Sequence, residues 1–204
     1  MRDYFLFKKK DTKRAVFLDR DGTINIDTVM AYKKSDYMML DGCIEALSLV
    51  SELDIYIFIV TNQSGIALGR YSSHDMSSFN KLIVDDFVKN NIELNGIYYC
   101  PHYDEKNLPE GHSVCLCSKP MPGLLLEALC DFDICFDDSI IIGDKPSDIG
   151  AGINAGIKNT ILVTTGIYKN GSYLGERYAD RYKPRYVVPD ILQAASIVKD
   201  IFTS

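Results

Sequence analysis

The sequence predicts an α/β protein built on a mostly parallel sheet, and three observations lead to this fold class. Short apolar runs alternate with amphipathic stretches along the chain, which is the pattern of βαβ units. Some of these runs are apolar throughout, as strands are when helices cover both faces of a parallel sheet. Three predicted strands end in polar, reactive side chains. Ligands bind beyond the carboxyl ends of strands in such sheets, so we expect these three ends to form one site.

Composition limits the possible classes of protein. The chain has 204 residues, which suits one large core, so we expect a single domain over residues 1–204. Its formal net charge of -6 argues against binding to a nucleic-acid backbone. The longest apolar runs are too short to cross a bilayer, and the apolar N-terminal segment is too short for a signal peptide. We therefore expect a cytoplasmic protein with no membrane or nucleic-acid partner. The sequence has no coiled coil or obvious dimer patch, so a monomer is expected.

The first part of the chain predicts two strands and a helix. Residues 15–18 are four apolar residues rich in β-formers, and they predict the first strand. Residues 24–40 predict a polar loop that contains several aromatic residues. A helix is predicted from 41 to about 53, where apolar residues recur on one face. Residues 55–60 are apolar throughout and predict a buried strand, followed by the polar loop 61–65.

The middle of the chain continues the alternation. An apolar stripe at helical spacing predicts a helix over about 73–90, and a short strand follows around 97–99. Residues 123–131 follow a proline and predict a helix. The isoleucine-rich run 139–143 predicts another buried strand, with a short helix over 148–155.

The end of the chain adds two further strands and a last helix. Residues 160–163 and 186–188 are β-forming runs, and residues 190–201 have helical periodicity.

Two carboxylates, Asp19 and Asp21, follow the first predicted strand. A buried strand normally ends in neutral turn residues, because an unpaired carboxylate at the edge of a core is costly to desolvate. Two carboxylates there require nearby cations, such as a metal ion or lysines. An ordinary Asp-Gly turn is the alternative interpretation. The polar ends of two other strands, Thr61-Asn62 and Asp144-Lys145, favour the functional one.

Three cysteines and a histidine are clustered between residues 100 and 117. Cys100 and His102 precede Cys115 and Cys117, and clustered cysteines in a chain without an export signal more often hold metal than form disulfides. Three thiolates and one imidazole complete a tetrahedral zinc set of the closed, structural kind. His112 is a competing ligand, and free buried thiols are the alternative. The remaining cysteines are interpreted as small buried hydrophobic residues: Cys43, Cys130 and Cys135.

Four ordered motifs resemble those of the haloacid dehalogenase-type phosphatases, over residues 15 to about 165. They are Asp19-x-Asp21-Gly22-Thr23, Thr61-Asn62, Lys119-Pro120 and Gly143-Asp144-Lys145-x-x-Asp148. More narrowly, three segments resemble the D-glycero-D-manno-heptose 1,7-bisphosphate phosphatase and histidinol-phosphatase branch: residues 18–25, 60–67 and 97–102. The resemblance implies a Rossmann-like three-layer αβα sandwich. It also implies a small zinc loop at about 98–118 instead of a large cap domain, with the Cys-x-His…Cys-x-Cys pattern present here.

The resemblance also implies hydrolysis of a phosphomonoester through an aspartyl-phosphate. Asp19 matches the nucleophile and Asp21 the general acid and base. Mg²⁺ would be held by Asp19, the backbone carbonyl of Asp21 and Asp144, which are the hard oxygen ligands that this ion prefers.

Five other residues receive supporting roles from the same resemblance. Thr61, with backbone amides around Asn62, would hydrogen-bond the phosphoryl oxygens. Lys119 would supply positive charge to the phosphoryl group, and Lys145 would do likewise or support the substrate. Asp148 would orient Lys119 or lie in the second shell of the metal. For the two lysines, solvated surface charge is the alternative.

Two departures from the pattern bear on the substrate. The branch usually has a His-x-Gly-Tyr-like stretch where this chain has residues 28–31, and an arginine where it has Ser118. An arginine fork grips a second phosphate or a sugar hydroxyl with a geometry that serine cannot supply. A heptose bisphosphate of lipopolysaccharide or capsule precursor synthesis is the first candidate, with histidinol phosphate or another sugar phosphate as alternatives. A zinc-containing binding protein is the non-enzyme alternative.

Overall fold

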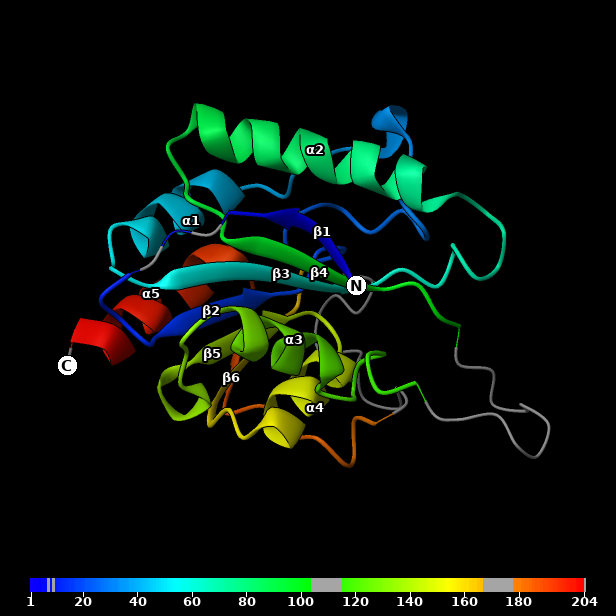
Figure 1. Cartoon of the computed structure of the whole chain (residues 1–204). Helices are drawn as coiled ribbons and strands as arrows, with labels where there is room; N and C mark the ends of the chain where they lie inside the picture. Colours follow the sequence, from blue (N-terminus) through cyan, green and yellow to red (C-terminus); the bar gives the residue numbers. More distant parts are fainter. Residues whose placement is uncertain (7, 9, 104–114, 167–177, 204) are drawn as a thin grey trace.

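The computed structural model describes residues 1–6, 8, 10–103, 115–166 and 178–203. Within these residues one sheet has the strand order β1-β4-β3-β2-β5-β6-β7 (Figure 1). Its strands are β1 (Arg2–Phe5), β2 (Ala15–Leu18), β3 (Tyr56–Asn62), β4 (Gly96–Cys100), β5 (Ile140–Gly143), β6 (Asn159–Val163) and β7 (Tyr186–Val188). The helices are α1 (Cys43–Ser51), α2 (Ser73–Lys89), α3 (Gly123–Asp131), α4 (Pro146–Ala155) and α5 (Ile191–Thr203).

The fold has three layers, because helices cover both faces of the sheet. Figure 1 shows α1, α2 and α5 on one face and α3 and α4 on the other. Successive side chains of a strand point to opposite faces, so the apolar strands supply two cores. In β2, Val16 and Leu18 belong to the core under α1, α2 and α5, whereas Ala15 and Phe17 belong to the core under α3 and α4. The α/β class, the mostly parallel sheet and the three-layer arrangement are confirmed.

Strand β1 was not predicted, and it is the antiparallel member of the sheet. It pairs with β4 at one edge, with Arg2 opposite Tyr98 and Phe5 opposite Gly96, while the other strand pairs are parallel. An edge strand has a neighbour on one side only and needs no continuous apolar run. The four residues of β1 are exposed or half-buried, which is why their pattern gave no strand signal.

Two predicted boundaries shift at the functional edge of the sheet. Thr61 and Asn62 were expected in a loop but lie inside β3, where they pair with Tyr99 and Cys100 of β4. Helix α4 begins two residues earlier than expected, at Pro146, since proline suits the first helical turn. Its first turn is closed by Asp148, whose Oδ2 accepts from the backbone N–H of Lys145 at 2.9 Å.

Strand β2 lies at the point where the strand order reverses. The chain runs from β2 outward through β3 and β4, and then returns to β5 on the other side of β2. Open α/β sheets bind ligands in the crevice at this switch point, beyond the carboxyl ends of the strands. Asp19 follows β2 and Asp144 follows β5, so the topology alone places these carboxylates side by side. Among the described helices, none has the length and apolar character needed to cross a membrane.

Candidate active site

The polar strand ends meet in a cavity of about 220 Å³ at the switch point. Side chains from the ends of β2 and β3, from the loop before α3 and from the start of α4 line it. The lining residues are Asp19, Asp21, Asp27, Val29, Met30, Thr61, Asn62, Gln63, Ser64, Tyr71, Lys119, Lys145, Ser147 and Asp148. Every residue expected to act on the phosphoryl group is therefore at one place in the molecule.

Lys119 is the buried cation of this cavity. Its Nζ lies 2.6 Å from Oδ1 of Asp19 and 2.6 Å from Oδ1 of Asp148, and it donates to the carbonyl of Val60 at 2.8 Å. Burial alone would lower the pKa of Lys119, but the charges of Asp148 and Asp19 outweigh it and raise that pKa above its usual value. Lys119 is therefore a permanent positive charge beside Asp19, and solvated surface charge does not describe it.

The side chain of Asn62 fixes the segment that carries Lys119. Its Oδ1 accepts from the backbone N–H of Lys119 at 3.0 Å, and its Nδ2 donates to the carbonyl of the same residue at 3.2 Å. The end of β3 thus holds the lysine in place through backbone contacts. Thr61, one residue earlier, is buried, and its Oγ1 accepts from Nε2 of Gln63 at 2.9 Å.

Asp144 is a buried carboxylate with unmet hydrogen-bonding capacity. Among the described residues neither of its side-chain oxygens has a hydrogen-bond partner, and Nζ of Lys145 lies 3.8 Å away from Oδ2. Burial raises the pKa of Asp144 well above its usual value, and burial together with the charge of Asp148 also raises that of Asp19. Because burial disfavours the charged form of these two carboxylates, a cation bound beside them would be stabilising.

The carboxylates form a set that could hold a metal ion. One oxygen each of Asp19, Asp144 and Asp148 lies within 4.8 Å of the others. Gly22 is at φ +91°, and a Cβ on it would come within 2.4 Å of Oδ2 of Asp144, so the chain approaches this carboxylate closely. The donors of this set are all oxygen atoms, which Mg²⁺ prefers. The oxygens of Asp144 that accept no hydrogen bond and the close approach of the chain at Gly22 also fit this ion.

Lys145 is a second lysine that lines the cavity. Its Nζ donates to Oδ2 of Asp27 at 3.0 Å, and its side chain is 28% exposed. Burial alone would lower its pKa, but the charges of Asp144, Asp19 and Asp27 raise it. Lys145 is thus cationic and oriented, with part of its surface open to a ligand.

The carboxylate of Asp21 accepts hydrogen bonds from donors whose part in the site the sequence did not predict. Arg20, Asn25 and Gln63 all donate to it. Burial alone would raise the pKa of Asp21, but Arg20 and these hydrogen bonds hold it below its usual range. The available signal was an arginine between two aspartates at the end of an apolar strand, a place where a charge needs a partner.

The four predicted zinc ligands converge beyond the end of β4. Sγ of Cys117 lies 3.0 Å from that of Cys100 and 3.1 Å from that of Cys115, and Nδ1 of His102 lies 3.1–3.6 Å from the three sulfurs. A tetrahedral ion with bonds of roughly 2.0–2.3 Å needs donors about 3.5 Å apart. These residues could therefore hold a zinc ion, and hydrogen bonds within the cluster outweigh burial and lower the pKa of Cys115 to about 7. His112, the competing ligand, lies outside the described residues.

The three cysteines outside the cluster were expected to be buried, and the structure agrees with this only in part. Cys43 is buried, as expected, but Cys130 is exposed and Cys135 is half-buried. Cys130 lies near the end of α3, on a side of the helix that is exposed. The interpretation as buried hydrophobic residues is wrong for Cys130, because one cysteine in a short helix does not reveal which side faces the core.

Comparison with known proteins agrees with this geometry. The HAD-hydrolase-like family model matches residues 116–194. The D-glycero-beta-D-manno-heptose-1,7-bisphosphate 7-phosphatase of Pasteurella multocida is 40% identical over 174 residues, which are 82% of this chain and 94% of that protein. The enzyme of the same name from Haemophilus influenzae is 38% identical over 186 residues, 91% of this chain and 97% of that protein.

Solved structures share the fold. The D,D-heptose 1,7-bisphosphate phosphatase from B. bronchiseptica, solved with magnesium and phosphate, superposes with a TM-score of 0.77 at 24% identity. The match covers 92% of this chain and 98% of that one. A HAD-like protein from Mesorhizobium loti has a TM-score of 0.79 at 25% identity, and the match covers 99% of this chain and 92% of that one. With the relatives above, these matches show that the chain belongs to the haloacid dehalogenase-type phosphatases, in the family of the D-glycero-D-manno-heptose 1,7-bisphosphate 7-phosphatases.

Proposed function

We propose that the chain is a Mg²⁺-dependent phosphatase that releases the 7-phosphate of D-glycero-D-manno-heptose 1,7-bisphosphate through an aspartyl-phosphate on Asp19. The observation that carries the chemistry is the contact of Asp19 with Lys119, beside the orphaned carboxylate of Asp144. The relatives that share 36–40% identity with the chain and bear this enzyme name support the substrate. The enzyme would then act in the synthesis of lipopolysaccharide or capsule precursors.

Asp19 is the proposed nucleophile. Its Oδ attacks phosphorus, the bond from phosphorus to the ester oxygen breaks, and the electron pair leaves with that oxygen. Asp21 gives a proton to the leaving oxygen. In the second step Asp21 takes a proton from water as the water oxygen attacks phosphorus and frees Asp19. Lys119 offsets the negative charge shared by Asp19 and the phosphoryl group, and Thr61 donates to a phosphoryl oxygen.

Asp19, the backbone carbonyl of Asp21 and Asp144 are the proposed Mg²⁺ ligands. A bound Mg²⁺ would neutralise the charge of the phosphoryl group and let a carboxylate approach it. Asp148 is bonded to Lys119 at 2.6 Å, so we assign it the role of orienting that lysine. Lys145 and the backbone around Asn62 are the proposed further contacts for the substrate.

We further propose that Cys100, His102, Cys115 and Cys117 bind a structural zinc ion. With all four positions supplied by protein, no open position is left for a substrate or water. Cys117 lies two residues before Lys119, so zinc would fix the segment that leads into the active site. We expect one domain over residues 1–204, acting as a cytoplasmic monomer on a small phosphorylated molecule, without nucleic acid or membrane as partner.

A second substrate class is kept as a candidate because of Ser118. Its hydroxyl accepts from Nδ2 of Asn62 at 3.4 Å, and it carries no charge for a second phosphate. Val29 and Met30, from the other departing stretch, line the cavity. Histidinol phosphate or a sugar monophosphate would not need the missing arginine.

The experiment that tests the proposal measures phosphate release from these substrates with and without Mg²⁺. We expect Asp19→Asn to abolish turnover, with a loss of more than about 10³-fold, while zinc content and thermal unfolding stay as in the wild type. Asp133→Asn is the matched control, since Asp133 is 74% exposed and outside the cavity. Wild-type turnover by Asp19→Asn would refute the mechanism. A preference for histidinol phosphate over the heptose bisphosphate would refute the first substrate.

A further inference from the structure

Arg20 is a fully buried cation beside the catalytic cavity that the chemistry above does not use. Its residue exposure is 0%, and its guanidinium lies 4.7 Å above the ring of Phe79. Its Nε donates to Oδ1 of Asp21 at 3.0 Å and its Nη2 to Oδ2 at 2.8 Å, which makes a two-pronged pair with that carboxylate. Burying a guanidinium is costly unless it is paired and fully hydrogen-bonded, so this pair is an integral part of the site.

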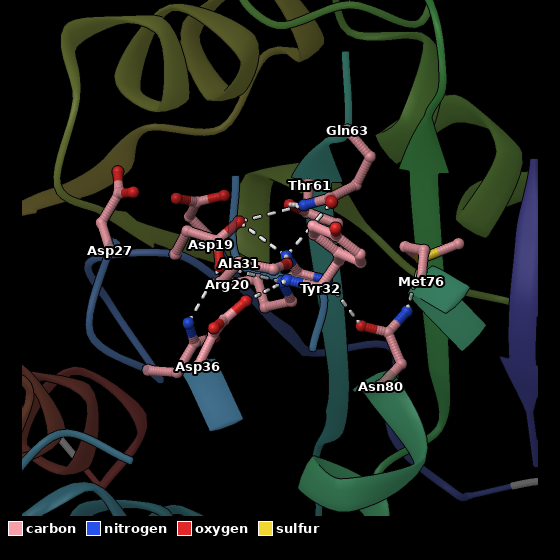
Figure 2. Close-up of polar contacts among 12 residues, drawn as sticks. Asp19, Arg20, Asp27, Ala31, Tyr32, Asp36, Thr61, Gln63, Met76 and Asn80 are labelled. Carbon is pink, nitrogen blue, oxygen red and sulfur yellow. Dashed lines mark hydrogen bonds and ion pairs between the residues drawn. The ribbon is translucent and has the colours of Figure 1, made fainter. Parts of the chain in front are cut away.

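The remaining donors of Arg20 reach three other segments (Figure 2). Nη1 donates to Oδ1 of Asn80 on α2 at 2.9 Å. Nη2 also contacts the carbonyl of Ala31 at 3.0 Å and Oε1 of Gln63 at 3.1 Å. The guanidinium is therefore tied to α2, to the loop after β2 and to the loop after β3. The guanidinium cannot rotate without breaking several hydrogen bonds, so it holds the carboxylate of Asp21 in one orientation.

The carboxylate of Asp21 has no acceptor position left in this arrangement. Oδ1 accepts from Arg20 and from Nδ2 of Asn25 at 2.9 Å, and Oδ2 accepts from Arg20 and from Nε2 of Gln63 at 3.0 Å. A carboxylate has about four acceptor positions. For Asp21 to carry a proton to or from a reacting oxygen, one of these four bonds must open.

The four bonds are not equivalent. Bonds from a guanidinium to a carboxylate are charge-assisted and roughly twice as strong as bonds from a neutral amide. The amides of Asn25 and Gln63 are therefore the donors that yield. Gln63 also donates to Oγ1 of Thr61 at 2.9 Å, so its Nε2 has a second partner when it leaves Asp21. The Arg20 fork remains and sets where the freed oxygen points.

We propose that Arg20 is a positioning residue, which holds the carboxylate of Asp21 by a two-pronged bond while an amide partner gives way to the oxygen of the leaving group. This inference rests on the proposed function, because it assigns Arg20 a part in the proton transfer by Asp21. In that transfer the bond from phosphorus to the ester oxygen breaks, its electron pair goes to that oxygen, and the proton of Asp21 joins it. Arg20 touches none of the reacting atoms and acts through Asp21.

The test compares Arg20→Lys with the wild type on two substrates. Lysine keeps the positive charge but cannot form the fork. D-glycero-D-manno-heptose 1,7-bisphosphate releases an alkoxide that needs a proton, whereas p-nitrophenyl phosphate releases a stabilised phenolate that does not. The ratio kcat/KM reports the steps up to departure of this group. We expect Arg20→Lys to lower it about 10- to 100-fold for the heptose bisphosphate and less than about 3-fold for the aryl phosphate.

Two further variants make the result specific. Asn80→Leu removes one support of the guanidinium without touching Asp21, and we expect the same bias between substrates at about 3-fold. It serves as the second measurement if Arg20→Lys does not fold, as judged by thermal unfolding. Arg185→Lys is the matched control, because Arg185 donates to Asn159 at 2.7 Å outside the catalytic cavity, and both substrates should keep wild-type values.

Equal losses on the two substrates would overturn the proposal, since a distorted Asp19 or Lys119 would slow both alike. Unchanged kinetics of Arg20→Lys would overturn it as well. If the wild type releases phosphate from neither substrate, the proposed function itself fails and the role of Arg20 falls with it. If the wild type is active and dependent on Asp19 but the bias is absent, the role of Arg20 alone is refuted.

Discussion

At the level of single residues, the site combines three buried carboxylates with one buried ammonium group. Asp19, Asp144 and Asp148 are each at most 4% exposed, and Lys119 pairs with two of them. A buried charge without a partner is expensive, so the surplus negative charge centres on Asp144. A divalent cation bound there would compensate this charge.

Ser118 offers a prediction about substrate binding. We expect Ser118→Arg to lower KM for the heptose bisphosphate about 3- to 10-fold with kcat within about 2-fold, because a guanidinium beside Lys119 would bind a second phosphate equally in the ground and transition states. Steady-state phosphate release measures both constants. Ser118→Gln is the matched control of similar bulk without charge. If both variants change KM alike, the effect is steric and the prediction is wrong.

At the level of elements, the cysteine cluster ties the end of β4 to the chain that leads to α3. We expect Cys117→Ser to lose bound zinc and to lower kcat/KM at least about 10-fold, because Lys119 would lose the anchor two residues before it. Elemental analysis and phosphate release give the two measurements. Cys130→Ser is the matched control, since Cys130 is exposed on α3. A near-stoichiometric zinc content in Cys117→Ser would contradict the assignment of the ligand set.

Helix α2 has a carboxylate that makes stability depend on pH. Asp86 accepts from Lys89 at 2.8 Å and from the hydroxyl of Tyr37 at 2.7 Å, and these bonds lower its pKa. Because the folded value is the lower one, the stabilisation is present above the unfolded pKa of about 3.9 and is lost as pH falls through the folded value. We expect Tyr37→Phe to reduce the loss of unfolding free energy between about pH 5 and pH 3. Urea unfolding at several pH values measures it, and an unchanged pH slope would contradict it.

At the level of the whole molecule, the proposed Mg²⁺ site would link ligand binding to global stability. A ligand bound by the folded state alone stabilises by about 2.7 kcal/mol at 100 times its Kd. We expect Mg²⁺ to raise Tm of the wild type, because it relieves the buried charge of Asp144. Asp144→Asn should be at least as stable as the wild type without Mg²⁺ and should gain nothing from it.

Thermal unfolding at increasing Mg²⁺ concentration measures this link. Asp133→Asn is the matched control, since its carboxylate is exposed and pairs with Lys13 on the surface, and its Mg²⁺ response should equal that of the wild type. An equal rise in Tm for Asp144→Asn would show that Mg²⁺ binds elsewhere.

The predicted elements agree with the structure where periodicity is strong. The helix predicted over 123–131 and the strand predicted over 186–188 have the observed bounds. Buried strands and amphipathic helices are fixed by local pattern, and so their existence can be predicted from one sequence. The edge strand β1 was missed because its partner β4 is some ninety residues away and its own residues are only partly buried. Its place depends on a contact that no local window contains.

The sequence by itself determined the α/β class and the polar strand ends, since both follow from local periodicity and from motifs with fixed spacing. It also determined the cluster of three cysteines and a histidine, and the family resemblance. Only the tertiary structure decided that Asn62 holds the backbone of Lys119, that Asp144 accepts no hydrogen bond from the described residues, and that Arg20 binds Asp21. These are properties of distance and burial between segments far apart in the chain. The type of a charged residue does not reveal whether its side chain is buried. Only the fold determines its burial, and therefore which partners it needs.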